Sequence, residues 1–133
     1  MKTLPAGKYY IGDCCYVLGD GYEPREIWSE FCNQFFDDGE DIVIDGHSIV
    51  AYSTAYGDGE YSSNVGASFP VDAGLIGCTP AALWKGVGNP FGCLAITFKT
   101  EFTCESDGKG VMDFGGVHID TRDEDDDNED EEY

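Results

Sequence analysis

The chain has 133 residues, with 27 acidic against seven basic side chains and a net charge of −20. A charge of that sign disfavours direct binding to nucleic-acid phosphates or to an anionic membrane surface, and it favours basic partners or cations. The length corresponds to one domain with its own core, and an aromatic content of 14% exceeds that of disordered chains.

The acidic residues are concentrated toward the C-terminus. Residues 121–133 carry nine acids and one arginine, a net charge of −8, which leaves −12 for the rest of the chain. Because like charges repel and almost no apolar side chain is present to anchor this part, we expect it to be disordered. We therefore predict a single β-rich globular domain at 1–121 and an acidic low-complexity tail at 122–133.

The first residues and the cysteines indicate a compartment. Residues 1–5 are not followed by the apolar run of a signal peptide, and no window approaches the roughly 18 apolar residues of a membrane span. We therefore expect a soluble intracellular protein, with no membrane partner. Its six cysteines are then expected to be reduced thiols that mostly fill the core.

The N-terminal part combines extended segments with one helix. Residues 8–11 and 15–18 are rich in Tyr, Ile and Val, which predicts two extended segments around a turn at Gly12-Asp13. Apolar residues recur on one helical face over residues 24–36, which predicts an amphipathic helix. Asp37-Asp38-Gly39 ends this helix, although acidic side chains at a helix C-terminus oppose its dipole.

A hairpin follows the helix. Asp45-Gly46 is a strong two-residue turn signal between the apolar segment 42–44 and the alternating segment 47–56. In that second segment Ile49 and Ala51 share one face, and Val50 and Tyr52 share the other. Further strands are predicted at 60–63, 68–72, 93–104, 111–114 and 117–120, and one helical turn at 80–84.

These elements predict an α+β fold. We expect a mainly antiparallel sheet of about six to eight short strands, barrel-like or a sandwich, with one amphipathic helix at about 24–36 packed across it. Pro70 removes a donor from the sheet hydrogen bonds, so the segment 68–72 is predicted to be an edge strand. The segment 93–104 is the longest strand candidate.

The densest group of chemically able side chains is the turn from Gly12 to Cys15. An enzyme could use a cleft formed by this turn together with Asp58 and Asp72, with Asp13 or Cys15 as the reactive group. A thiol nucleophile needs a lowered pKa, however, and a carboxylate beside the thiol raises it. We therefore interpret this turn as mainly structural and keep Asp13, Cys15, Asp58 and Asp72 as candidate catalytic residues.

Metal and cofactor motifs are weak. There is no C-x-x-C pair, so a zinc site from Cys15, Cys32, His47 and another cysteine would depend entirely on the fold. Asp58, Glu60 and Asn64 surround a glycine turn but lack the spacing of a calcium loop. No phosphate-binding glycine motif is present. We predict no cofactor and name no metal ligand, although divalent-cation binding remains an alternative.

A binding patch is predicted around the turn Gly57-Asp58-Gly59. Tyr56 and Tyr61 flank this turn, and both are expected to be exposed beside Asp58 and Glu60. Exposed tyrosines are common in protein interfaces. We therefore predict that Tyr56, Asp58, Glu60 and Tyr61 bind a partner.

Three motifs carry a resemblance to a known group. They are Gly7-Lys8-Tyr9-Tyr10-Ile11-Gly12-Asp13-Cys14-Cys15-Tyr16-Val17, Tyr56-Gly57-Asp58-Gly59-Glu60-Tyr61 and Val71-Asp72-Ala73-Gly74-Leu75-Ile76-Gly77. They resemble small uncharacterised phage, bacterial and large-virus proteins that open with a G-x-Y-x-I-G-D-P-C-Y-V motif, over residues 4–120. Cys14 stands where that group has proline. The resemblance implies a viral setting, such as the cytoplasm of an infected host cell, and it implies no mechanism.

Three functions therefore remain open. The first is a non-enzymatic interaction protein, of viral origin, that acts on a basic protein surface and does not bind nucleic acid directly. The second is a small enzyme that uses the cleft described above, and the third is a divalent-cation-binding protein. The sequence favours the first of these.

Overall fold

The structure, a computed structural model, describes residues 1–19 and 26–123. The strands are β1 Lys2–Leu4, β2 Gly7–Gly12, β3 Ile42–Ile44, β4 His47–Ser53, β5 Gly59–Ser62, β6 Ser68–Val71, β7 Leu75–Pro80, β8 Leu94–Phe98, β9 Phe102–Ser106, β10 Val111–Phe114 and β11 Val117–Asp120. The helices are α1 Cys15–Leu18, α2 Glu26–Asp37, η1 Ala81–Leu83 and η2 Thr121–Asp123. The predicted α+β class is confirmed, with more and shorter strands than the sequence suggested.

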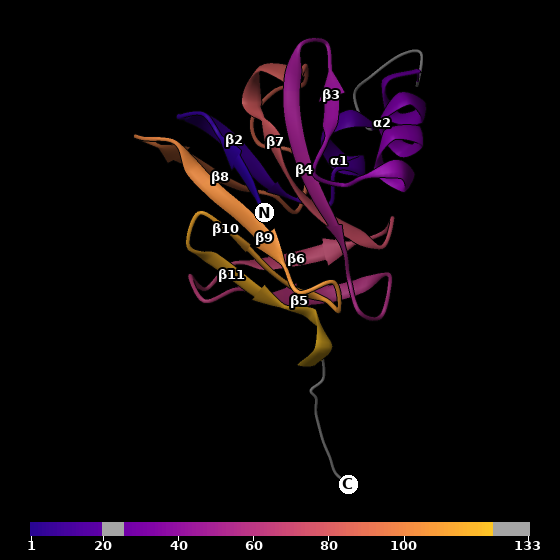
Figure 1. The fold of residues 1–133 in the computed structure, drawn as a ribbon, viewed down its shortest axis with the longest axis vertical. Helices are drawn as coiled ribbons and strands as arrows, with labels where there is room; N and C mark the ends of the chain where they lie inside the picture. Colours follow the sequence, from indigo (N-terminus) through magenta and orange to yellow (C-terminus); the bar gives the residue numbers. More distant parts are fainter. Residues whose placement is uncertain (20–25, 124–133) are drawn as a thin grey trace, which may run out of the picture.

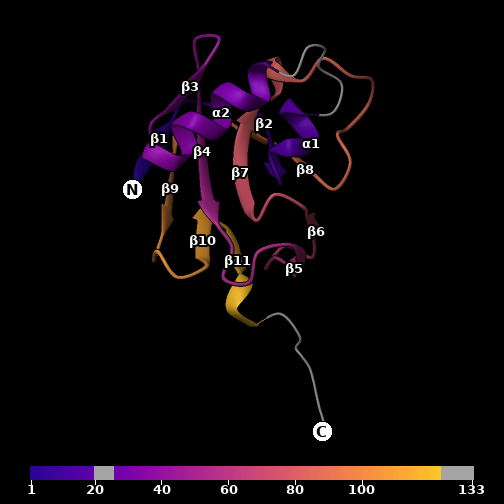
Figure 2. The ribbon, with the colours of Figure 1, turned by 90° about the vertical axis from the view of Figure 1, so that its right-hand side faces the viewer.

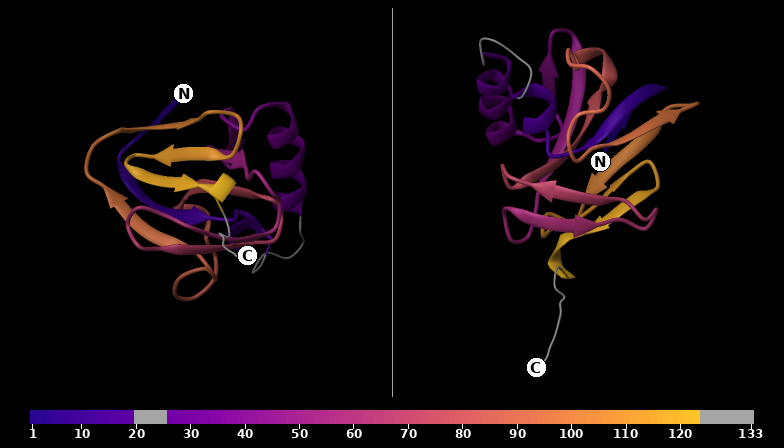
Figure 3. Two further views of the ribbon diagram at one scale, coloured as in Figure 1. Left: turned by 90° about the horizontal axis from the view of Figure 1, so that it is seen from below. Right: turned by 180° about the vertical axis from the view of Figure 1, so that it is seen from behind.

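The elements form three layers. The five-stranded sheet β3-β4-β7-β2-β8 lies in the middle, with α1 and α2 packed on one face. The four-stranded sheet β1-β9-β10-β11 and the β5–β6 hairpin pack on the other face. Figure 1 shows the helices on one side of β4, and Figure 3 shows the β5–β6 hairpin crossing the lower part of the molecule.

Strand alternation builds both cores. Tyr9 and Ile11 face the core between the sheets, and Tyr10 faces the helices. In β4, Val50 belongs to the first core, whereas Ile49 and Ala51 belong to the second, as the alternating pattern predicted. Because both faces of the middle sheet are covered, apolar side chains of its central strands are buried on both sides.

The predicted helix is confirmed, and a second helix was missed. Phe31 of α2 is fully buried against the middle sheet, while residues 24 and 25 of the predicted range lie outside the described residues. The prediction of an extended segment at 15–18 is wrong, because these residues form α1. Asp13 accepts a hydrogen bond from the Cys15 backbone amide, which starts the helical turn in spite of the β-favouring side chains.

The hairpin at 42–53 is confirmed. β3 and β4 pair antiparallel with Ile44 opposite His47. The two turn residues Asp45 and Gly46 both have positive φ, at 52° and 80°. This is the two-residue turn geometry that matches the twist of the paired strands.

The predicted strand at 93–104 is divided between two sheets. β8 pairs with β2 in the middle sheet, whereas β9 pairs with β1 and β10 in the four-stranded sheet. The chain turns between them, and the rings of Phe98 and Phe102 stack 3.6 Å apart at the corner. Side-chain alternation continues on both sides of the corner, so the periodicity alone could not locate the break.

Two sheet edges are capped by side-chain amides. Gln34 of α2 accepts a hydrogen bond from the Val43 amide and donates one to the Val43 carbonyl, at 2.7 and 2.9 Å. Asn64 pairs with β11 in the same manner, accepting from the His118 amide and donating to the Gly116 carbonyl. These amides occupy backbone groups through which an edge strand would otherwise pair with another chain.

Further predictions concerned an edge strand, several short elements, membrane spans and the tail. Pro70 lies in β6, which pairs only with β5 among the described strands, so the edge-strand prediction is confirmed. β10, β11 and the helical turn η1 form where they were expected. Among the described residues no helix is long and apolar enough to cross a membrane. The predicted disordered tail lies outside the described residues from position 124 onward.

Candidate functional site

Asp13, the acid that the sequence singled out, is completely buried. Its carboxylate has no exposed surface and accepts three backbone hydrogen bonds. Oδ1 accepts from Cys15 N at 3.0 Å, and Oδ2 accepts from Asp72 N and Ala73 N at 2.7 and 2.6 Å. Such charge-assisted bonds offset the cost of burying a carboxylate. We therefore assign Asp13 a structural role, joining the end of β2 to the β6–β7 turn.

The predicted cleft is only partly assembled. The β6–β7 turn also contacts the loop between β4 and β5, because Thr54 N donates to the Gly74 carbonyl. Within that loop, Thr54 Oγ1 donates to the Gly57 carbonyl. The backbones near Asp13, Asp72 and Asp58 are therefore connected. The Asp58 and Asp72 residues are exposed, whereas Asp13 is enclosed, so the three carboxylates do not face one common cavity.

The thiols around Asp13 are disfavoured as nucleophiles. Burial, followed by the nearby Asp13 carboxylate, raises the pKa of Cys93 to about 12. Burial is also the main cause of the raised pKa values of Cys14 and Cys32, with Asp13 adding to both. For Cys14, one of the two thiols beside Asp13 in the sequence, the carboxylate thus acts against activation, as expected. Cys15 is half-buried at the start of α1.

Glycine is needed where the chain passes close to this turn. A Cβ on Gly12 would lie 2.8 Å from Cys93 Sγ and 3.0 Å from the Gly92 carbonyl oxygen. Both distances are too short for a side chain, so Gly12 allows the β8 end to pack against the Asp13 turn. The predicted role of this turn in defining the fold has a direct physical basis here.

The predicted tyrosine patch is corrected by the structure. Tyr61 was expected to be exposed, yet it is 2% exposed and its hydroxyl donates to the Gly57 carbonyl. The ring points inward because β5 alternates toward the core between the sheets. Tyr56 is 62% exposed, and Asp58 and Glu60 are exposed as well. Glu60 accepts a hydrogen bond from Ser68 Oγ.

The cation-site candidates do not come together. Asn64 uses both atoms of its amide on β11, so it is not free to bind an ion beside Asp58. Across the described residues, no group of three or more His, Cys, Asp or Glu side chains is placed to hold a metal ion.

A groove on another face contains acids that the sequence did not single out. It has a volume of about 480 Å³ and lies between the C-terminal end of α2, strand β4 and the β9–β10 turn. Figure 2 shows α2 crossing in front of β4 with β9 and β10 below it. We call this the acidic groove; its lining residues are Phe35, Phe36, Asp38, Gly39, Glu40, Ala51, Tyr52, Ser53, Ser106 and Gly108.

Glu40 is the centre of charge in the acidic groove. The Met1 ammonium group lies 2.9 Å from Glu40 Oε2, and the Tyr52 hydroxyl donates to the same oxygen at 2.5 Å. Burial alone would raise the pKa of Glu40, but the Tyr52 hydrogen bond and the ammonium group outweigh it and lower the pKa. Glu40 therefore stays ionised at neutral pH, and its surroundings already accept an ammonium group.

The acids near Glu40 act on the same ammonium group. The pKa of the Met1 ammonium is raised first by its hydrogen bond to Glu40, and the charges of Glu105 and Asp38 raise it further. Next to them Lys2 Nζ lies 3.2 Å from Asp41 Oδ1. Carboxylates from the α2–β3 connection and from β9 thus produce one region of negative potential.

The helix adds to this potential. α2 ends at Asp37 with no basic residue in its last turn, and its carbonyl end carries a partial negative charge. Acids here are unfavourable for the isolated helix, and the sequence showed this conflict. Conflicts of this kind occur at functional sites, so Asp37-Asp38 was the signal that could have located the groove.

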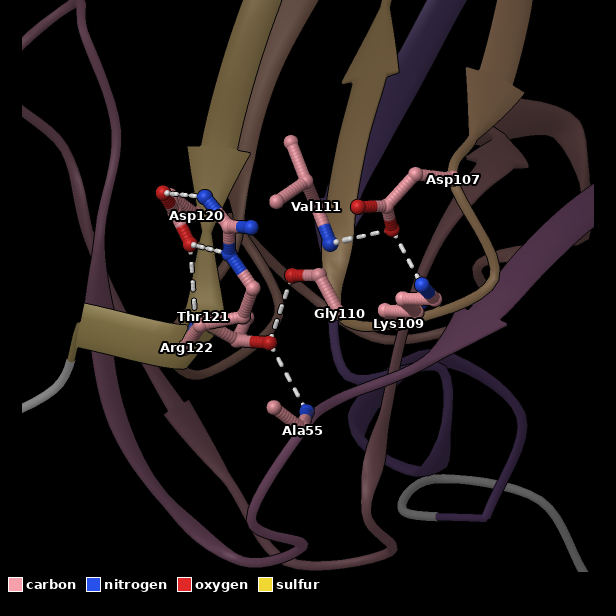
Figure 4. A network of polar contacts seen from close by, with 8 residues as sticks. All are labelled: Ala55, Asp107, Lys109, Gly110, Val111, Asp120, Thr121 and Arg122. Atoms are coloured by element: carbon pink, nitrogen blue, oxygen red, sulfur yellow. Dashed lines mark hydrogen bonds and ion pairs between the residues drawn. The ribbon is translucent and has the colours of Figure 1, made fainter.

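Figure 4 shows how the far wall of the acidic groove is held in place. Asp107 accepts hydrogen bonds from Lys109 N and Val111 N, which lower its pKa and close the β9–β10 turn. Thr121 Oγ1 donates to the Gly110 carbonyl at 2.6 Å and accepts from Ala55 N at 2.8 Å. The wall is therefore fixed by bonds from Thr121 at the start of η2, which also reaches the segment after β4.

No family model matches it, and neither the curated proteins nor the solved structures contain a match.

Proposed function

We propose that this protein is a non-enzymatic interaction protein that binds a basic protein surface through the acidic groove. The observation that carries the proposal is the ammonium group at Glu40, which lies within the influence of Glu105 and Asp38 as well. A lysine or arginine side chain presents a cation of the same charge. The net charge of −20 favours a basic partner, as the sequence predicted. The binding site, however, lies beside α2 and not at the predicted tyrosine patch.

Phe36 supports the same proposal. It is 82% exposed at the edge of the acidic groove, next to Phe35 with ring centroids 5.8 Å apart. Lysine and arginine carry apolar stems that pack on aromatic rings, and their charged ends are attracted to the ring faces. An exposed phenylalanine beside carboxylates can therefore contact both the apolar stem and the charged end of a basic side chain.

The other two functions lack a comparable observation. The enzyme hypothesis needs an accessible Asp13 or an activated thiol, and Asp13 is enclosed with its oxygens occupied. The divalent-cation hypothesis needs converging ligands, and the described residues contain no such group.

The proposal is tested with a fluorescein-labelled peptide of alternating lysine and glycine, titrated with the full chain and followed by anisotropy. Binding at low salt should weaken steeply as salt is added, because the contact is between exposed charges. Glu40→Gln should weaken binding about tenfold, the loss of one charge-assisted contact. An acidic peptide of the same length should not bind.

Glu101→Gln is the matched control. Glu101 is exposed just before β9, so its replacement changes the net charge by the same amount outside the acidic groove. It should leave the affinity nearly unchanged. If Glu101→Gln weakens binding as much as Glu40→Gln does, the attraction is a property of the overall charge and the proposed site is wrong.

A further inference from the structure

Among the described strands, the two large sheets have four edges, and three of them are protected. At the β3 edge the backbone groups of Val43 are occupied by the Gln34 amide, and at the β11 edge the Asn64 amide bonds to the strand. The β1 edge has only three residues and carries the charges of Met1 and Lys2. Capping, shortness and charge are the usual means of preventing an edge strand from pairing with another chain.

The fourth edge, formed by β8, is open. β8 pairs with β2 on one side, and its backbone makes no other hydrogen bond with the described residues. The strand Leu94–Phe98 contains no charged residue, no proline and no glycine. Figure 1 shows β8 on the side of the molecule away from α2. Its outward amides and carbonyls are therefore available to a further strand.

The apolar row of β8 is only half covered. Leu94, Ile96 and Phe98 pack against the core between the sheets, yet all three remain half-buried. On the neighbouring strand β2, the residues opposite the first two, Ile11 and Tyr9, are buried. An added strand would lie about 4.8 Å from β8, so apolar side chains on it would cover the part of this row that is still exposed.

The charge of this edge is opposite to that of the chain as a whole. Residues 1–12 and 73–100 contain no acid and four lysines, a charge of +4, so the remaining residues carry −24. These two segments supply β2, β7 and β8, the three adjacent strands at the open side of the middle sheet. Lys8, Lys85 and Lys99 form no ion pair with the described acids. The β8 edge is therefore basic in an acidic protein.

Two of these lysines lie at the end of β8. Lys99 directly follows the strand and is exposed. Lys8 lies on β2 opposite Thr97, and its ammonium nitrogen is 5.5 Å from the centre of the Tyr10 ring. Because opposite residues of paired strands point to the same face, Lys8 and Thr97 share the face away from the half-covered apolar row. The edge thus has an apolar face and a basic face.

We propose that the β8 edge is a second binding site, which accepts an extended acidic segment of another protein as an additional strand. Backbone hydrogen bonds to β8 supply the affinity, and alternate side chains supply the specificity. Apolar side chains on one face of the segment cover Leu94, Ile96 and Phe98. Carboxylates on its other face meet the ammonium groups of Lys8 and Lys99. The acidic groove, at β4 and the end of α2, is a separate site for a partner of opposite charge.

A second copy of this chain fits the β8 edge less well than a separate acidic segment does. Two copies that each carry a charge of −20 repel each other. A five-residue edge is also short against the roughly 20–30 residues that each partner contributes to a stable interface. A single extended segment needs only the strand contact, and its carboxylates match the lysines.

The test uses short fluorescein-labelled peptides titrated with the full chain and followed by anisotropy. The salt concentration is about 0.15 M, where charges more than about 8 Å away are largely screened. One peptide alternates valine with glutamate, and a second alternates valine with glutamine. A third has the sequence of residues 124–132, which is acidic but contains no β-favouring side chain. Two further forms of the glutamate peptide are N-methylated on alternate amides, each on the opposite set.

The expected result separates strand pairing from charge. The glutamate peptide should bind more tightly than the glutamine peptide, and at least tenfold more tightly than the 124–132 peptide. One methylated form should lose binding at least tenfold and the other should keep it, because only one set of amides faces β8. Equal affinities of the two methylated forms, or tight binding of the 124–132 peptide, would overturn strand pairing.

Variants at exposed positions test the charges, and melting curves check that they fold. Lys99→Gln and Lys8→Gln should each weaken binding of the glutamate peptide about twofold to fivefold, the range of an exposed ion pair. Thr97→Glu should weaken it further, because it places a carboxylate on the edge itself. The control Lys109→Gln removes the same charge in the β9–β10 turn and should leave the affinity unchanged. A loss with Lys109→Gln as large as with Lys99→Gln would show that no particular site is involved.

This proposal and the proposed function fail separately. Glu40→Gln should weaken binding of the lysine-glycine peptide and leave the glutamate peptide unaffected, and Lys99→Gln should do the reverse. If the glutamate peptide does not bind while the lysine-glycine peptide does, only the β8 site is wrong. Dimers in sedimentation velocity that Thr97→Glu abolishes would identify a second copy as the occupant and overturn the acidic segment.

Discussion

Two groups of carboxylates in this protein show opposite uses of the same chemistry. Asp13 is buried and accepts three backbone hydrogen bonds, so both of its oxygens are occupied within the fold. The Glu105 side chain is exposed on the sheet, and Glu40 holds an ammonium at the surface. The acid that stands out in the sequence therefore supports the structure, while acids that do not stand out lie at the surface, where a partner could reach them.

The largest effect should come from Asp13→Ala. Its removal leaves the amides of Cys15, Asp72 and Ala73 without their acceptor. An unsatisfied donor costs about 1–3 kcal/mol when it is buried, and these three are partly buried, so the free energy of unfolding should fall by about 3–5 kcal/mol. Urea titration followed by circular dichroism measures this.

Asp58→Ala is the control for that experiment. Asp58 was an equal candidate in the sequence, but it is exposed on its turn. Its replacement should change the free energy of unfolding by less than about 0.5 kcal/mol. Equal losses for Asp13→Ala and Asp58→Ala would contradict the structural role given to Asp13.

The outcome for Asp13 shows where sequence reasoning succeeded and failed. The turn at Asp45-Gly46 is local, so two residues sufficed to predict the β3–β4 hairpin. Residues 15–18 favour strands by composition, and the Asp13 hydrogen bond that makes them helical depends on the side chain's place in the fold. Local signals therefore predicted local structure and failed where a distant contact decides.

The acidic groove could not be predicted from any one segment. Its walls come from residues 35–40, 51–53 and 106–108, which meet only after both sheets have formed. The position of Glu105 opposite Asp113 likewise depends on the register of β9 and β10. The only sequence signal for this groove is the pair of acids at the end of α2, which oppose the helix dipole.

A second prediction concerns the capped edge of β3. Gln34→Ala removes both side-chain hydrogen bonds to Val43, which is 49% exposed. Water can replace part of them, so the loss of unfolding free energy should be about 1 kcal/mol. The freed edge should also promote association at high concentration, which sedimentation velocity detects. Unchanged sedimentation together with unchanged stability would show that the cap has no effect.

A third prediction follows from the pKa of Glu40. The Tyr52 hydrogen bond and the Met1 ammonium lower this pKa below its ordinary value of 4.5, so Glu40 is ionised throughout the range above 4.5. A lowered pKa in the folded state stabilises the protein above the unfolded value, and this contribution is lost as the pH falls through the folded value. Basic-peptide affinity should therefore be level between pH 7 and about 5 and decline below about 4.5. Anisotropy titrations measure it, and a decline that begins near pH 6 would point to a different group.

The smallest effect should come from Phe36→Ala. The side chain is 82% exposed, so the free energy of unfolding should change by less than about 0.5 kcal/mol. Peptide binding should weaken by about 0.5–1 kcal/mol, the range of an exposed cation–π contact. Val87→Ala, at a 99% exposed position outside the acidic groove, is the control and should change neither quantity. Equal effects of the two substitutions would remove Phe36 from the binding site.

The most direct measurement determines both the unfolding free energy and the basic-peptide affinity of Asp13→Asn and Glu40→Gln beside the wild type. Asp13→Asn should lower the free energy of unfolding and leave the affinity unchanged, because Asp13 never reaches the surface. Glu40→Gln should do the reverse, lowering the affinity about tenfold with little change in stability. If folded Asp13→Asn loses peptide binding while Glu40→Gln keeps it, the division between a structural and a binding acid is wrong.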